Sequence, residues 1–200
     1  MNIKKKTLIW ITLIWVIITF INYYYTNFFF LAFIWFGMVL FFAIITLIEL
    51  SKLNTTRASI IKFIVLLILL FFTFRRDVPN LIIEKIDWVI FENKRNEIVK
   101  QVKKGILNPN VEWNGWVCEL PYEFPVVSNG GNDIGIYRNK KQDKLTVSFW
   151  VFRNFFDHPS TYIIYSNDKK IIDRLEKKID EKPKNNWKLK KNWYRIYGDY

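Results

Sequence analysis

The opening of the chain contains one long apolar run, Thr7–Ile48, which reads TLIWITLIWVIITFINYYYTNFFFLAFIWFGMVLFFAIITLI. None of its 42 residues carries a charge. A helix needs about 20 apolar residues to cross the ~30 Å hydrocarbon layer of a bilayer. Because the run is about twice that length, it predicts a hairpin of two membrane-spanning helices.

The turn of this hairpin is predicted at Asn22–Asn27, because the asparagines interrupt the run and tyrosine rings suit the headgroup interface. The first two spans are then expected at residues 7–21 and 28–48. A third is expected at residues 59–74, which completes a transmembrane region of residues 1–76. Lys62 lies near the start of this third span, where its ammonium group can extend to the headgroups.

Two further features of this region bear on its role. Lys4–Lys6 before an apolar stretch resembles the start of a signal peptide, but the apolar stretch is too long for one and no small-residue cleavage site follows, so a retained anchor is expected. No charged residue lies at mid-depth in any span, where transporters and proton relays normally need one. The spans therefore predict an anchor and not a conduction path.

Flanking basic residues predict the orientation in the membrane. With the amino terminus in the cytoplasm, the inner side collects Lys4, Lys5, Lys6, Lys52, Arg57 and Lys62. The outer side then has Arg75, Arg76, Lys85, Lys94 and Arg95. The first span usually dominates, and its lysine triplet favours a multi-pass protein of the cell membrane with an extracytoplasmic carboxyl-terminal domain.

After the spans the pattern becomes that of a water-soluble domain. Residues 77–110 are expected to form a connector that contains a helix over Leu81–Lys104. The first half of this helix, with Trp88 and Phe91, is a candidate for lying on the membrane surface. Residues 111–200 are expected to form an α+β domain with an antiparallel sheet and a helix that carries Ile171 and Leu175. The predicted strands are Trp113–Leu120, Asp133–Arg138, Leu145–Arg153, Thr161–Tyr165 and Trp187–Tyr197.

Catalytic and metal sites are not expected. Cys118 and His158 are the only cysteine and the only histidine, and a thiol-dependent hydrolase that uses both is the enzymatic alternative. Cys118 shares a predicted strand face with Trp116 and Leu120, which favours a core position. One histidine and one cysteine are too few for a zinc site. No phosphate-binding loop or serine elbow is present, so no cofactor is expected.

Two loops are candidates for binding a protein partner. Asn129, Gly130, Gly131 and Asn132 form a glycine loop whose backbone amides have the freedom to converge on a polar ligand, although an ordinary inter-strand loop has the same composition. The second loop contains Phe155–Phe156, two large aromatic side chains that either anchor a partner or pack back onto the sheet.

Positive charge is a third feature that bears on partners. Lys184–Tyr197 interleaves basic with aromatic residues, which suits lipid headgroups, wall polymers, single-stranded nucleic acid or a solvated strand face. The chain has a net charge of +12, and its lysine-, asparagine- and isoleucine-rich composition accounts for that excess as well as an anionic partner does. Binding of nucleic acid is not expected.

The stretch Leu120–Asp168 resembles small uncharacterised bacterial proteins that join hydrophobic helices to a compact α+β domain. The likeness is in the runs SNGGND, VSFWVFR, DHPS and YIIYSND. It implies no catalytic residues. The function hypothesis is a membrane-anchored, non-enzymatic binding domain. An immunity protein that neutralises an envelope-acting toxin is the alternative, by analogy of layout.

Overall fold

A computed structural model describes residues 4–25, 28–54, 56–129, 131–139, 143–152 and 159–199. The chain divides into two compact units, Met1–Ile86 and Asp87–Tyr200.

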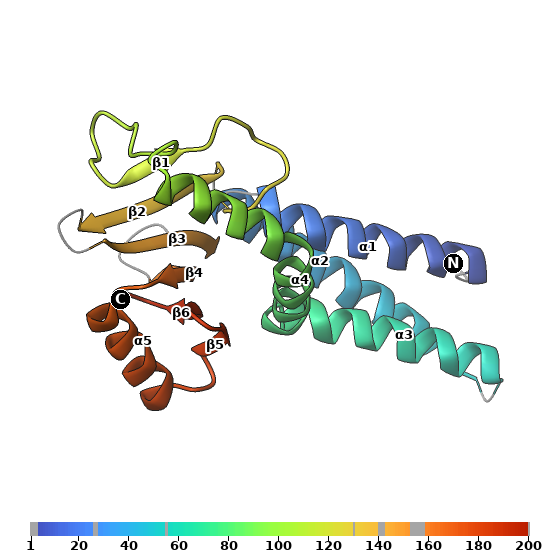
Figure 1. The fold of residues 1–200 in the computed structure, drawn as a ribbon. Coiled ribbons are helices and arrows are strands. Elements are labelled where there is room, and N and C mark those ends of the chain that lie inside the picture. The colour runs from blue at the N-terminus through green and yellow to red at the C-terminus, as the bar shows by residue number, and fades with distance from the viewer. Residues whose placement is uncertain are drawn as a thin grey trace. The chain divides into compact units, whose positions relative to one another are not determined.

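Unit 1 contains three long apolar helices (Figure 1). They are α1 (Lys5–Tyr25), α2 (Phe28–Ser51) and α3 (Arg57–Phe74). Each is long and apolar enough to cross a bilayer, and large side chains such as Phe33 and Phe36 are exposed on them. Water would make such exposure unfavourable and lipid does not. The predicted helical anchor is therefore confirmed as that of a multi-pass membrane protein with three candidate spans.

The first predicted turn begins later than the sequence suggests. Asn22 lies within the last turns of α1, buried, and its side-chain amide donates a 2.8 Å hydrogen bond to the Ile18 carbonyl. An asparagine in a helix can bond to the carbonyl four residues back in this way, and so continue the helix it was expected to end. Thr26 and Asn27 lie outside the described residues.

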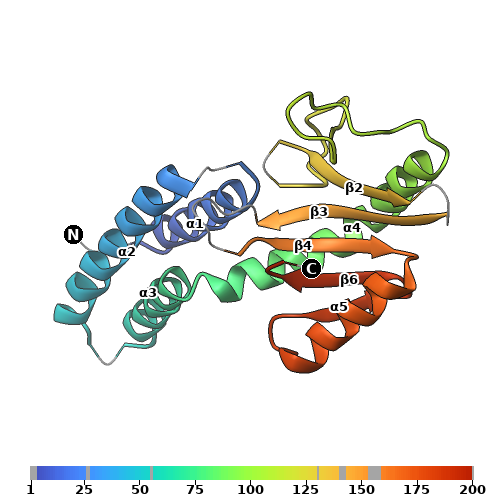
Figure 2. The same ribbon diagram turned by 90° about the vertical axis from the view of Figure 1, so that its left-hand side faces the viewer.

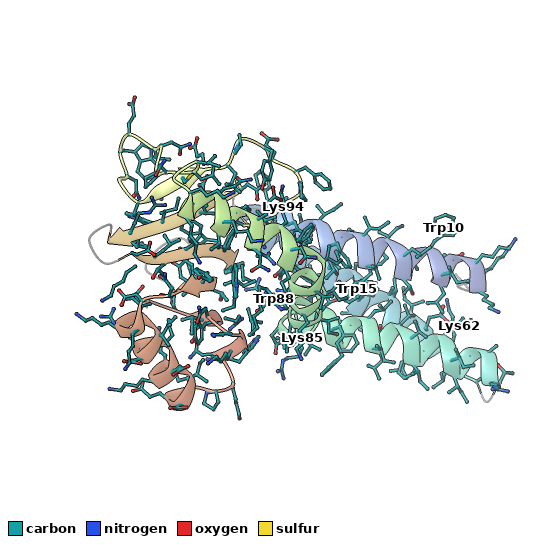
Figure 3. The ribbon with its side chains drawn as sticks, in the orientation of Figure 1. Trp10, Trp15, Lys62, Lys85, Trp88 and Lys94 are labelled. Carbon is teal, nitrogen blue, oxygen red and sulfur yellow. The ribbon has the colours of Figure 1, made fainter. Side chains whose placement is uncertain are left out.

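Polar contacts join the three helices within the unit. The Trp15 indole of α1 donates a 2.8 Å hydrogen bond to Thr73 of α3. The Lys62 ammonium of α3 lies 3.5 Å from the carboxylate of Glu49, which is buried near the end of α2. Figure 3 labels Trp15 and Lys62 on these helices. Lys62 therefore has an acidic partner from the neighbouring helix, which the sequence pattern of a single span did not predict.

Helix α4 (Asp77–Lys103) follows α3 after a two-residue turn, and its residues contribute to both units. Asp77 stands in its first turn, where the exposed amides and the helix dipole favour a carboxylate. Gly105, with a φ of +74°, ends it as predicted. Trp88 packs against Trp193, with ring centroids 5.3 Å apart, and both residues belong to unit 2. The location of the first half of the helix on a membrane surface stays a prediction.

Unit 2 is built on one antiparallel sheet of six strands. In chain order the strands are β1 (Val117–Glu119), β2 (Asp133–Asn139), β3 (Lys144–Phe152), β4 (Thr161–Ser166), β5 (Trp187–Lys190) and β6 (Trp193–Tyr197). Their spatial order is β1-β2-β3-β4-β6-β5. The predicted α+β class with an antiparallel sheet is confirmed.

Two strand predictions differ from the structure. The first strand is shorter, because Trp113 lies in a turn closed by a bridge between Val111 and Asn114 and is 77% exposed. The last predicted strand is a hairpin of β5 and β6, since Asn192 adopts a φ of +67° and reverses the chain. Asparagine tolerates this left-handed conformation better than most residues.

The sheet has one helix on each face (Figure 2). The later part of α4 lies behind it in that view, and Arg95 of α4 reaches the face that carries Phe149. Helix α5 (Lys169–Glu181) lies in front, over β4, β6 and β5. The α5 side of the core consists of Ile164, Leu175, Tyr194 and Ile196.

Candidate functional site

The candidate site lies on the part of the sheet that α5 leaves uncovered. Asp168 begins α5 by accepting a hydrogen bond from the Lys170 amide, the usual role of an N-cap. Leu175 is fully buried in the helix's contact with β4 and β6. The thirteen residues of α5 form a helix only about 20 Å long, at 1.5 Å per residue. This helix covers β4, β6 and β5 and is too short to cover the whole sheet. The same face of β2 and β3 carries no helix among the described residues (Figure 2).

Four aromatic rings form a row across this open face. Trp116 stacks on Tyr137, with centroids 5.2 Å apart and planes 16° apart. Trp116 also lies 5.8 Å from Trp150, which lies 5.8 Å from Tyr162. Strand alternation places Tyr137, Trp150 and Tyr162 on one face, and Trp116 reaches them from the segment before β1. Contacts of this kind contribute about 0.5–1.5 kcal/mol per ring pair beyond area burial.

Gly135 allows Trp116 to approach the sheet. A Cβ atom at this position would clash with the Ser148 hydroxyl oxygen and lie 3.0 Å from Cζ3 of Trp116. The approach to Ser148 is far inside ordinary contact distance and the approach to Trp116 is tighter than ordinary contact, so with a larger residue both side chains would have to shift. Glycine at position 135 is thus a requirement of the ring row.

Beside the rings runs an open groove of about 700 Å³. This volume is within the ~300–1,000 Å³ of small-molecule sites. Aromatic, aliphatic and charged side chains contribute to its walls. It is lined by Gly115, Trp116, Ile136, Tyr137, Arg138, Lys144, Leu145, Thr146, Tyr162, Asp168, Ile171 and Asp199.

Thr146 forms part of the groove's polar lining and is held in place. Its hydroxyl is 2.9 Å from that of Ser166, which in turn accepts the backbone amide of Asp168 at 3.1 Å. This chain of hydrogen bonds ties β3 and β4 to the first turn of α5. The groove wall is therefore preorganised, which reduces the conformational entropy that the protein would lose when a ligand binds.

Charged groups stand at both ends of the groove. At one end the Lys144 ammonium lies 3.5 Å from the Asp168 carboxylate. Arg138 lines this end only with its backbone side, because its guanidinium donates to the Val102 carbonyl of α4 on the opposite face of the sheet. At the other end is Asp199, next to Gly198, whose amide bonds to the Ser160 carbonyl before β4 begins. Because β4 has six residues at ~3.3 Å per step, the two ends are about 17 Å apart. Lys178 bonds to the Asp199 carbonyl, and burial lowers the pKa of this lysine.

The predicted glycine loop is held together by its own asparagine side chains. Asn132 is 1% exposed, and its side-chain oxygen accepts the amides of Val127 and Ser128 at 2.8 and 3.1 Å. Its side-chain nitrogen donates to the carbonyls of Tyr122 and Pro125. Asn129 is buried and donates to the Val151 carbonyl at 2.6 Å. A partner at this loop cannot use these two side chains without breaking those bonds.

The glycines of this loop and the aromatic loop are less fully described. Gly131 has a φ of +105°, and Gly130 lies outside the described residues. Phe155, Phe156 and His158 lie outside them as well. Binding through Phe155 and Phe156 stays a prediction.

Cys118 is a core residue. It is 1% exposed, and desolvation raises the pKa of its thiol, with smaller contributions from Asp133 and Glu119. A nucleophilic thiolate needs a lowered pKa and access to substrate. The structure gives this thiol neither. Among the described residues, no three acidic, histidine or cysteine side chains lie together as a metal site would require.

The basic and aromatic residues of the final hairpin contact each other and their neighbours. The Arg195 guanidinium lies 4.5 Å from the Trp187 ring, and Lys188 is 2.8 Å from Glu176 of α5. Lys190 pairs with Glu92 of α4 and lies over the Trp193 ring. These contacts explain the interleaved pattern at Lys184–Tyr197 without a ligand.

Comparisons with known proteins add no assignment. No protein-family model, curated protein or solved structure matches this chain. The groove itself was not predicted from the sequence. Its signal is the alternation of Tyr137, Thr146, Trp150 and Tyr162 onto one face, which becomes visible only when the strand register is known.

Proposed function

We propose that this chain is a membrane-anchored, non-enzymatic binding protein whose soluble domain takes up its ligand in the groove beside Trp116 and Tyr137. The observation that carries the proposal is a 700 Å³ groove beside an aromatic row in which Trp150 is buried and Tyr137 is exposed. Tyr137 is 42% exposed. A ring exposed in a concave, preformed site provides the apolar contact from which ligands gain most of their affinity.

The shape of the groove favours an extended segment of a protein partner. Its ends are about 17 Å apart, which five residues of an extended chain span at ~3.3 Å each. Lys144 at one end offers a partner to a carboxylate, and Asp199 at the other end offers one to a cation. The aromatic wall between them suits apolar side chains. We expect a peptide segment with an acidic group at one end and a basic group at the other.

Photo-crosslinking in intact cells tests this function. A photoreactive phenylalanine at position 137 should form one discrete adduct with a partner, and the same group at Lys177, whose side chain is 77% exposed on the outer side of α5, should not. Ile171→Trp should abolish the adduct by filling the groove. Asp173→Trp is the matched control, because Asp173 is an exposed residue of the same helix outside the groove lining. An adduct that survives Ile171→Trp would refute the groove as the binding site.

We also propose that this domain lies outside the cytoplasm, on the strength of the Lys4–Lys6 triplet before the first span. Lys177→Cys supplies an exposed thiol in a protein whose native Cys118 is buried. A membrane-impermeant maleimide should label this variant in intact cells and leave the wild-type protein unlabelled. Labelling only after the cells are opened would place the domain, and its partner, in the cytoplasm.

A further inference from the structure

We propose that unit 1 holds one anionic phospholipid, with an acyl chain in a crevice between α1, α3 and the first turns of α4 and with the phosphate beside Arg76. The crevice has a volume of about 190 Å³. This inference concerns the membrane unit alone and does not depend on the function proposed for the soluble domain.

The crevice is lined almost entirely by apolar side chains. They are Trp15, Val16, Thr19 and Phe20 of α1, Phe72 of α3, and Val78, Pro79, Ile82, Ile83 and Ile86 of α4. An apolar cavity of ~150 Å³ is already large enough to take up a benzene molecule. Ile82 is 53% exposed, so the crevice is open to its surroundings. Its walls belong to candidate membrane spans and to the residues that follow them, so in a bilayer lipid would surround the crevice.

The few polar groups near the crevice already have partners. The Trp15 indole donates to the Thr73 hydroxyl at 2.8 Å, and that hydroxyl donates to the Leu69 carbonyl at 2.7 Å. The Thr19 hydroxyl donates to the Trp15 carbonyl at 2.8 Å. Because these groups already form hydrogen bonds within the protein, they do not need water or a polar ligand as a partner. An alkyl chain is the occupant that loses no hydrogen bond on entering.

The depth of the crevice places it just below the headgroups. Phe72 lies two residues before the end of α3, which is about 3 Å along the helix axis. Phe20 lies four residues before the end of the first candidate span, which is about 6 Å along its axis. An acyl chain at this depth has its phosphate near the residues that follow α3. Those residues are basic.

Arg75 and Arg76 follow α3 directly, and they differ in their contacts. The Arg75 guanidinium makes two hydrogen bonds to Asp77, at 3.0 and 2.9 Å. Arg76 is exposed two residues before Val78, which lines the crevice. A guanidinium is the side chain best suited to grip a phosphate. Arg76 is therefore the residue that gives the site its preference for an anionic headgroup.

Native mass spectrometry of the full chain in detergent tests the proposal. The probe is an equimolar mixture of phosphatidylglycerol and phosphatidylcholine. The wild-type protein should retain one lipid, mainly phosphatidylglycerol. Ile82→Trp, which fills the crevice, should lower the bound fraction about tenfold, equivalent to ~1.4 kcal/mol. Ile61→Trp is the matched control, because Ile61 is a 49% exposed residue of α3 outside the crevice, and it should retain lipid as the wild type does.

Arg76→Gln separates the headgroup from the acyl chain. This variant should still retain one lipid but should no longer prefer phosphatidylglycerol. Equal retention by Ile82→Trp and wild type, or no preference in the wild type, would overturn the proposal. If Ile82→Trp does not fold, the wild-type protein is tested with phosphatidylglycerol that carries a diazirine on its acyl chain. This lipid should label residues 72–86 preferentially. Labelling spread evenly over the three spans would overturn the proposal.

Discussion

The buried ion pair between Arg95 and Asp87 of α4 gives the sharpest prediction for stability. The Arg95 guanidinium lies 2.6 Å from the Asp87 carboxylate, and both side chains are at most 4% exposed. The same guanidinium donates two hydrogen bonds to the Val127 carbonyl, at 3.0 and 2.9 Å. It thus connects α4 to the segment that leads into the glycine loop. Removing Asp87 would leave a buried cation without its counter-charge.

The size of the effect follows from these contacts. Breaking a buried pair by removing one partner costs ~3–5 kcal/mol, because an uncompensated charge stays buried. We expect a loss of this size for Asp87→Ala. Asp87→Asn also leaves the cation without a counter-charge but keeps an acceptor for the guanidinium, so it should cost less than Asp87→Ala, by up to the ~1.5–3 kcal/mol of a hydrogen bond to a charged group. The double variant Asp87→Ala/Arg95→Met removes both charges and should recover part of the loss, although the Val127 carbonyl then lacks its donors.

Thermal unfolding of the full chain in detergent, followed by tryptophan fluorescence, measures this series. At about 4 °C per kcal/mol for a domain of this size, Asp87→Ala should lower the midpoint by on the order of 10–20 °C. Asp77→Ala is the control, because it breaks an exposed pair with Arg75 and removes a first-turn carboxylate, which together should lower the midpoint far less than the loss of the buried pair does. If Asp87→Ala unfolds at the same midpoint as the wild type, the reasoning that this variant leaves the Arg95 charge buried and uncompensated is refuted.

Three further predictions concern single contacts in the soluble domain. Gly135→Ala should destabilise it by ~1–3 kcal/mol through overpacking, and Ser148→Ala in the same chain should recover part of this loss by removing the nearest clashing atom, as read from the unfolding midpoint. Cys118 should resist alkylation at pH 8 in the folded protein and react fully in denaturant, because burial raises its pKa and shields it; rapid labelling of the native chain would contradict this. The pKa of Glu176 is lowered, chiefly by the hydrogen bond from Lys188, so this pair contributes stability above the ordinary glutamate pKa of ~4.3 that is lost as the pH falls through the folded value. Lys188→Met should make the loss of stability below about pH 4 shallower, by a small amount that salt reduces, and an identical acid titration of both proteins would show that the pair contributes nothing.

The membrane unit and the order of secondary structure are readable from the sequence because they depend on local composition. An uncharged run of 42 residues can only be satisfied by two spanning helices, and alternating Val, Ile and aromatic residues identify β2, β3 and β4 in any context. Boundaries were less accurate where a single residue decides. Asn22 continues α1 by bonding to the preceding turn, and Asn192 reverses the chain between β5 and β6.

The groove, the crevice of unit 1 and the contact of Arg95 with Val127 depended on the tertiary structure, because each joins residues that are far apart in the chain. Trp116 meets Tyr137 only through the β1–β2 register, and Thr146 reaches the start of α5 only through Ser166. Which strands α5 covers is set by the packing of Leu175 and not by the amphipathic pattern, which identifies a buried face without saying what buries it. Local patterns thus determined the elements, and long-range packing decided which of their faces remained open to a ligand.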